Sequence, residues 1–193
     1  MIDQSIVFFL TIIVDFGFNI SATREVSHLR NRKEKLSQFY FNVVFIKIVL
    51  IVITFLILLG MTTLIERFSI ESSVYLYSFG LVIGTAIFPT WFFQGIEKMQ
   101  IISLINVGAK LIFTFSIFFV ILSPNDYEFV PILNGTSFIL TGIIGFLYSL
   151  KYVNFVLPKL KEVILIIKSS FSLFVSNFAV SLYTSSNTLI LGL

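Results

Sequence analysis

The sequence predicts an all-α integral membrane protein with about six transmembrane helices, and two observations carry that prediction. First, 57% of the 193 residues are hydrophobic and 12% are charged, with a mean hydropathy of +1.01. A soluble domain cannot bury so much apolar surface. Second, the apolar residues form continuous runs near the length of about 20 residues that a membrane helix needs, whereas barrel strands would alternate with a period of two.

The whole chain, 1–193, is expected to form one membrane domain. The expected spans cover about 5–20, 41–64, 74–93, 101–123, 130–150 and 171–193. The first span is short and carries Asp15. In the segment 156–168, lysines precede an apolar core, which predicts an amphipathic helix lying in the membrane interface. The alternative is that this segment extends the span that follows it.

Positive charge is unevenly shared among the connections. Ten of the thirteen Lys and Arg residues lie in 21–38, 94–100 and 151–170. The positive-inside rule therefore places these three connections in the cytoplasm. Both chain ends then lie outside, which is unusual for a chain without a signal peptide whose first span is short and charged. We therefore expect this chain to be a fragment, with helices missing at both ends.

Several classes of function are disfavoured. The chain has no cysteine and one histidine, His28, so a metal site is not expected. No connection exceeds roughly twenty residues, which leaves no room for a soluble catalytic domain. Phosphate-binding and nucleophile motifs are absent, and the positive-inside bias already explains the basic connections without nucleic acid. These observations predict a membrane protein that is not an enzyme.

Lys110 is the single residue that most clearly indicates a functional site within the membrane. It lies nine positions after the start of its expected span, about 14 Å into a core that is about 30 Å thick. An ionisable group at that depth costs about 3 kcal/mol or more, so Lys110 should face protein or a water-filled cavity. Ser103, Asn106 and Thr114 share its helical face.

Three other spans carry comparable polar stripes: Thr11–Asp15–Asn19, Asn134–Ser137–Thr141 and Asn177–Ser181–Thr184–Thr188. The neutral stripes alone favour ordinary hydrogen bonding between helices. With Asp15 and Lys110 included, we prefer the hypothesis that the four stripes line one hydrophilic cavity. Lys47 is the weaker case, because it lies near the end of its span and its amine can reach the interface. Gly80 and Gly84 predict close helix packing.

The stretch 89–100 joins two apolar runs and contains Pro89 and the only tryptophan, Trp91. Tryptophan favours the membrane interface, where its ring is in apolar surroundings and its N–H in polar ones. We expect this stretch to emerge at the cytoplasmic face, with Glu97 and Lys98 forming a solvated pair.

Two strings, DFGFNISATRE at 15–25 and PTWFFQGIEKM at 89–99, closely resemble the O-antigen and polysaccharide flippases, the polysaccharide-transporter branch of the MOP superfamily. Asp126-Tyr127 near Pro131 and SNFAVSLYTSSNTLILG at 176–192 are also similar to that family. The resemblance runs along nearly the whole chain in the family's order.

The resemblance implies a transporter of 12–14 helices in two lobes, of which this chain is part of the N-terminal lobe. It implies residence in the bacterial cytoplasmic (inner) membrane and flipping of undecaprenyl-diphosphate-linked oligosaccharide by alternating access. It implies no cofactor, with H⁺ or Na⁺ as the coupling ion. The implied partners are the lipid-linked oligosaccharide, membrane lipids, and polysaccharide polymerase and chain-length machinery.

The resemblance also suggests roles for individual residues. Candidates for attracting the anionic diphosphate are Lys110, Arg24 and, third, Lys47. Candidates for binding sugar hydroxyls are Asn106, Asn134, Asn177 and Asn187. Asp15 is the candidate for carrying the coupling ion, and its alternative role is a structural pair with Arg24. Motif residues expected to be structural are Gly17, Trp91, Gln94, Gly95 and Glu97.

Three alternatives stay open. A multidrug-type cation antiporter would share the fold, although its pocket should favour carboxylates, whereas the intramembrane charges here lean cationic. An O-antigen polymerase would need a larger external connection than 65–73 or 124–129. The chain by itself is also open to interpretation as an inactive fragment of a split flippase gene.

Overall fold

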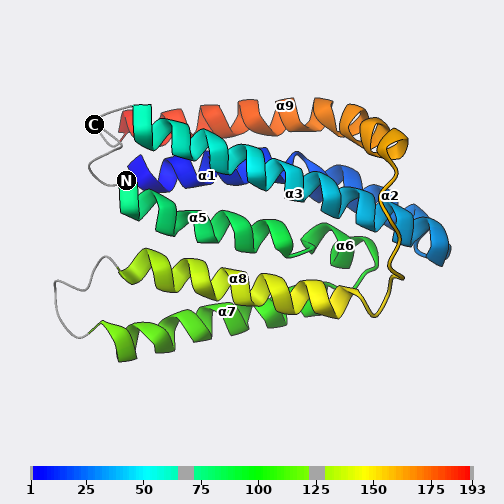
Figure 1. Cartoon of the computed structure of the whole chain (residues 1–193), viewed down its shortest axis with the longest axis horizontal. Coiled ribbons are helices and arrows are strands. Elements are labelled where there is room, and N and C mark those ends of the chain that lie inside the picture. Colours follow the sequence, from blue (N-terminus) through cyan, green and yellow to red (C-terminus); the bar gives the residue numbers. More distant parts are fainter. Residues whose placement is uncertain (1, 65–71, 122–128, 192–193) are drawn as a thin grey trace.

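The chain folds into a bundle of helices that run along one long axis (Figure 1). The computed structural model describes residues 2–64, 72–121 and 129–191, with side chains for 6–64, 72–121 and 129–184. The helices are α1 (Ile2–Asp15), α2 (Phe18–Leu29), α3 (Lys33–Leu64), α5 (Ser72–Ile87), α6 (Thr90–Gly95), α7 (Met99–Val120), α8 (Phe129–Ser149) and α9 (Leu160–Leu191).

Six helical stretches are long and apolar enough to cross a membrane, which confirms the predicted all-α membrane protein. They are Ile6–Leu29, Lys33–Leu64, Ser72–Gly95, Met99–Val120, Phe129–Ser149 and Leu160–Thr184.

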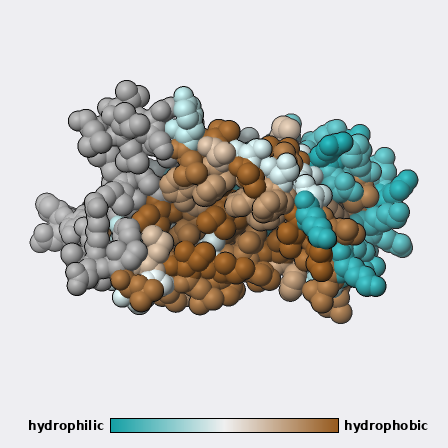
Figure 2. Space-filling model, turned by 90° about the horizontal axis from the view of Figure 1, so that it is seen from above, coloured by the Kyte–Doolittle hydropathy of each residue, from teal (hydrophilic) through white to brown (hydrophobic). Residues whose placement is uncertain are grey.

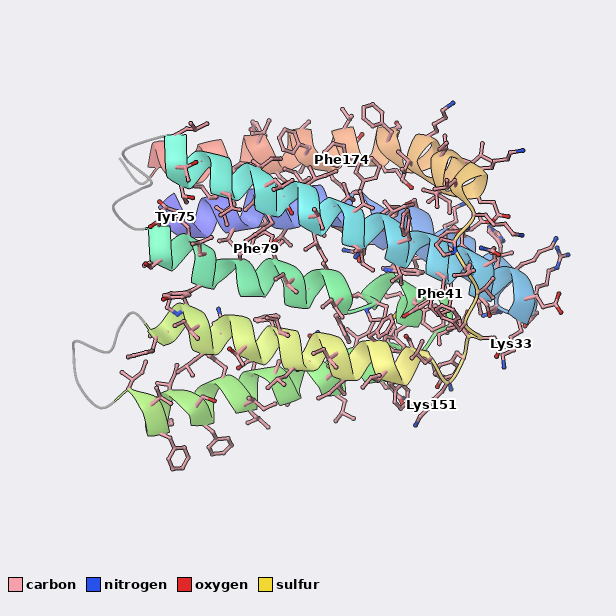
Figure 3. The ribbon with its side chains drawn as sticks, in the orientation of Figure 1. Lys33, Phe41, Tyr75, Phe79, Lys151 and Phe174 are labelled. Atoms are coloured by element: carbon pink, nitrogen blue, oxygen red, sulfur yellow. The ribbon has the colours of Figure 1, made fainter. Side chains whose placement is uncertain are left out.

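Hydrophilic residues gather at one end of the bundle, and apolar surface covers its length (Figure 2). The turns between α2 and α3, between α6 and α7 and between α8 and α9 all lie at this end (Figure 1). Lys33 and Lys151 mark it, and Tyr75 lies at the opposite end (Figure 3). We call this the basic end. The three cation-rich connections of the sequence are therefore on one side of the bundle.

The first span differs from its expected bounds of 5–20. It runs from Ile6 to Leu29 and is broken where Phe16 and Gly17 take positive φ angles of 48° and 74°. The helix continues past residue 20 because Ala22 and Val26, one turn apart, are both buried. The sequence missed this extension because the charged residues on the other face, such as Arg24, are typical of a connection.

The segment 156–168 does not form a separate helix. Residues 154–159 are not helical, and α9 begins at Leu160 and continues without a break. The backbone N–H of Lys159 donates to Asn42 Oδ1 at 2.9 Å, and Val163 in the first turn is 6% exposed. These contacts hold the start of α9 against α3, so the alternative of an extended span is the one that the structure supports.

Glycines set the closest helix packing, between α5 and α8. A Cβ added at Gly80 would lie 3.0 Å from the Cα of Gly135, and one at Gly142 would lie 2.6 Å from the carbonyl oxygen of Gly84. A Cβ at Gly84 would overlap the backbone carbonyl of Phe138. The two backbones therefore touch directly, as the Gly80–Gly84 spacing predicts.

Trp91 is 1% exposed and belongs to a buried aromatic cluster, so its ring packs against protein, and its depth at the membrane interface stays a prediction. Its ring centroid lies 5.5 Å from that of Tyr40 and 6.3 Å from that of Phe39. Phe92 and Phe93, both fully buried, extend the cluster. The short helix α6 turns these side chains inward, so tryptophan here contributes apolar contact area within the protein.

Candidate functional site

An ion pair buried inside the bundle is the main candidate site. The Nζ of Lys47 on α3 lies 3.8 Å from Oδ1 of Asp15 at the end of α1, and the two side chains are 7% and 22% exposed. Lys47 was expected near the end of its span. Because α3 already begins at Lys33, Lys47 lies about 21 Å along the helix and its amine meets Asp15 instead of the interface.

Asp15 is the last residue of α1, directly before the break in the first span. The carboxyl end of a helix carries partial negative charge, so a carboxylate is disfavoured there. The cation of Lys47 offsets both the charge of the Asp15 carboxylate and the partial charge of the helix end. Asn19, in the first turn of α2, lies close to the same carboxylate. Broken membrane helices commonly place their free ends at ion and substrate sites.

Gly17 makes the break possible. It adopts a left-handed φ of 74°, and a Cβ at this position would lie 3.0 Å from the backbone nitrogen of Phe174 on α9. Phe16 stacks on the ring of Phe174 with centroids 4.8 Å apart, and Phe174 extends from α9 toward the first span (Figure 3). The glycine predicted as structural therefore has two reasons to lack a side chain: its backbone angle and the nearness of α9.

Arg24 does not pair with Asp15, which was the alternative for both residues. Arg24 is exposed on α2 at the basic end, nine residues beyond Asp15 in the chain, and the ionic partner of Asp15 is Lys47.

Lys110 and Asn106 are exposed on α7, which packs chiefly against α8 and next against α6. On α8, Ser137 and Thr141 are buried and donate to carbonyls of their own helix. Among the described residues, the polar stripe on α7 is thus exposed and that on α8 is buried, so the two stripes do not line one common cavity. The common cavity stays a prediction for Asn134 and Asn177, which are partly buried. Asn187 lies outside the described side chains.

The two strings that carried the family resemblance contact each other. Thr23 Oγ1 donates to the backbone oxygen of Asn19 in its own helix at 2.7 Å, and it also lies 3.2 Å from the backbone oxygen of Trp91 and 3.3 Å from Gln94 Oε1. A Cβ added at Gly95 would lie 2.5 Å from Val26 Cγ1. These contacts hold α6 against α2, and the structural roles of Gln94 and Gly95 stay predictions.

Glu97 forms an ion pair with Arg30 at the end of α2. Both side chains are largely exposed, at 72% for Glu97 and 43% for Arg30. The sequence predicted that Glu97 would pair with its neighbour in the chain, Lys98. The structure instead connects the turn after α6 to the turn after α2.

The sequence missed a cavity of about 870 Å³ at the basic end, between α2, α3 and the start of α9. Its lining comes from residues 21–39 and 154–170, whose charges the positive-inside bias had explained. The sequence feature that could have indicated a cavity is the mixture of Glu, Ser, Gln and Asn residues among those cations. No group of three or more His, Asp or Glu residues that could hold a metal ion occurs in the described part of the chain.

The fold and the buried pair define a multi-pass helical membrane protein with an intramembrane charge, a feature common in transporters. The family described as "Polysaccharide biosynthesis protein" matches residues 2–193, and the chain belongs to that family.

Two curated relatives carry the name "Putative O-antigen transporter". The protein of Escherichia coli (strain K12) is 29% identical over 192 residues, covering 98% of this chain and 46% of its own length. The protein of Shigella dysenteriae is 31% identical over 199 residues, covering 98% of this chain and 48% of its own length. The chain thus spans about half the length of these relatives. No solved structure matches it significantly.

Proposed function

We propose that this protein takes part in flipping undecaprenyl-diphosphate-linked oligosaccharide from the cytoplasmic to the periplasmic leaflet of the bacterial inner membrane. The observation that carries the proposal is the similarity, along 98% of the chain, to two proteins named as O-antigen transporters. The six candidate spans support transport. Translocation by alternating access serves O-antigen, capsule or exopolysaccharide assembly, with polymerase and chain-length proteins as downstream partners.

In this proposal the basic end faces the cytoplasm, in accordance with the positive-inside rule. Arg24, exposed at that end, attracts the diphosphate as the cargo arrives. Lys110 lies in the middle of α7 and is exposed on the described surface, where contact with lipid is costly. Its proposed role is to meet the diphosphate along a polar path. Asn106, Asn134, Asn177 and Asn187 bind sugar hydroxyls along that path.

The buried pair supplies the coupling step. Lys47 neutralises Asp15 in the resting state, so Lys47 is not a free cation for the diphosphate. Binding of H⁺ or Na⁺ at Asp15 displaces Lys47 and weakens the contact between α1 and α3. The break at Phe16 and Gly17 gives α1 and α2 a point about which to move separately.

Complementation tests the function. The protein is expressed in a strain lacking its own O-antigen flippase, and surface polysaccharide is measured. We expect restoration, and about a tenfold or larger loss with Lys110→Ala at unchanged protein level, because the charge acts during transport. Lys98→Ala, an exposed lysine just before the same helix, is the matched control. Normal insertion without surface polysaccharide contradicts the proposal, and resistance to cationic drugs in its place favours the antiporter.

A further inference from the structure

The lining of the cavity at the basic end contains neither residue of the buried pair and none of the residues assigned to the proposed transport path. Its volume of about 870 Å³ is within the range of about 300–1,000 Å³ typical of small-molecule sites. Its walls come from one side of α2, the start of α3, the non-helical segment before α9 and the first turns of α9.

The charges of the lining balance. Three cations, Arg32, Lys35 and Lys159, face three carboxylates, Glu25, Glu34 and Glu162. One opposite-charge pair is already formed, with Lys159 Nζ 3.6 Å from Glu162 Oε1. A bare diphosphate would meet three carboxylates here, and an organic cation would meet three cations. The balance disfavours both, because like charges at short range repel.

One wall is fixed by hydrogen bonds. Asn42, fully buried, donates to Glu162 Oε2 at 2.8 Å and accepts from the backbone N–H of Lys159 at 2.9 Å. Gln38 donates to Asn42 Oδ1 at 3.2 Å and to the backbone oxygen of Leu157 at 3.0 Å. Ser37 accepts from the backbone N–H of Asn154 at 2.9 Å. The wall is therefore held in place by the protein itself, before any ligand arrives.

The remaining groups suit a ligand whose own groups both donate and accept. The amide hydrogens of Gln38 have partners, and among the described contacts its carboxamide oxygen has no donor. Glu25 and Glu34 accept, and Arg32 and Lys35 donate. Each hydroxyl of a sugar does both, whereas phosphate oxygens at neutral pH mainly accept. Phe39 and Leu165 supply apolar wall for the C–H face of a sugar ring.

We propose that this cavity is a saccharide site, which binds the sugar head of the lipid-linked cargo at the end of the bundle where the cargo is presented. The choice of ligand rests on the proposed function. The site recognises hydroxyl groups through Gln38, the Glu25 and Glu34 carboxylates and the Arg32 guanidinium. It is separate from the groups proposed for the diphosphate, so sugar and diphosphate are held by different residues.

The absence of cysteine from this chain makes the site testable by single-cysteine labelling. Ser169→Cys places a thiol in the lining, and Ser27→Cys places one on the exposed face of α2, at the same end but outside the cavity. Each variant, reconstituted in membranes, reacts with a water-soluble maleimide. The probes are undecaprenyl-diphosphate-linked oligosaccharide, undecaprenyl diphosphate without sugar, and the free oligosaccharide.

We expect both sugar-bearing probes to slow labelling of the Ser169→Cys variant, by about tenfold at ten times Kd, and to leave the Ser27→Cys variant unchanged. A second substitution, Glu34→Gln, should weaken that protection while the helical content of the protein is unchanged. Equal protection by undecaprenyl diphosphate overturns the proposal, because the cavity would then recognise the diphosphate. Lack of protection by any probe, or equal protection of the Ser27→Cys variant, overturns it as well.

The experiment separates this inference from the proposed function. Sugar-dependent protection without complementation supports the saccharide site and counts against transport. Complementation without protection supports transport and removes the saccharide site.

Discussion

Two helix contacts in this bundle are held together in different ways. The contact between α5 and α8 depends on close backbone packing, and the contact between α1 and α3 contains polar groups. Between α5 and α8 the backbones touch at Gly80, Gly84, Gly135 and Gly142, and no charged side chain lies between them. Between α1 and α3 the bundle encloses the Asp15–Lys47 pair beside a broken helix. Membrane helices gain little from excluding lipid, so close packing and polar contacts must hold them together. The first contact is close packing of two backbones, and the second contains the ion pair whose partners change in the proposed coupling step.

The largest expected effect comes from adding volume to the α5–α8 contact. Gly84→Leu should destabilise the fold by at least about 3 kcal/mol, because its Cβ overlaps the backbone of Phe138 and backbone yields less than a side chain. The measurement is equilibrium unfolding in mixed micelles followed by circular dichroism.

The matched control is Gly108→Leu on α7, where an added Cβ meets nothing within 4 Å among the described residues. That variant should stay within about 0.5 kcal/mol of the parent. Equal losses in the two variants would show that leucine at any helical glycine is harmful, and the importance of close packing between α5 and α8 would lose its support.

The next effect comes from the buried pair. Lys47→Met should cost about 3 kcal/mol, because Asp15 is left buried without its cation, and the same titration in micelles measures it. The double variant Asp15→Asn/Lys47→Met should recover most of that loss, since two neutral side chains carry no unpaired charge. If the double variant lost the sum of the two single losses, the pair would not be coupled, and the contrast between the two helix contacts would disappear.

Most of the fold could be predicted from the sequence, because a continuous apolar run signals a membrane helix by composition alone. The positions of the basic connections and the glycine contact also follow from local pattern. The break after Asp15 could not be predicted, since Phe16 and Gly17 do not by themselves exclude a helix and it is α9 that requires the glycine.

The candidate site was predicted only in part. Asp15 and Lys47 were both singled out, but nothing in the sequence shows that they face each other, because their pairing depends on where α3 begins. The cavity at the basic end escaped prediction for a similar reason. Its lining comes from two segments more than a hundred residues apart, and each of them alone is typical of a solvated connection.

The smallest effect concerns the link between the two regions. Tyr40 on α3 and Ser149 on α8 share a buried hydrogen bond through their hydroxyls, and Ser149 also bonds to the backbone oxygen of Phe146. Tyr40→Phe keeps the ring in the aromatic cluster and should cost about 1 kcal/mol, the value of one hydrogen bond. Ser149→Ala and the double variant complete a cycle in unfolding free energy, with an expected coupling of about 1 kcal/mol. A coupling near zero would mean that the aromatic rings alone join α3 to α8.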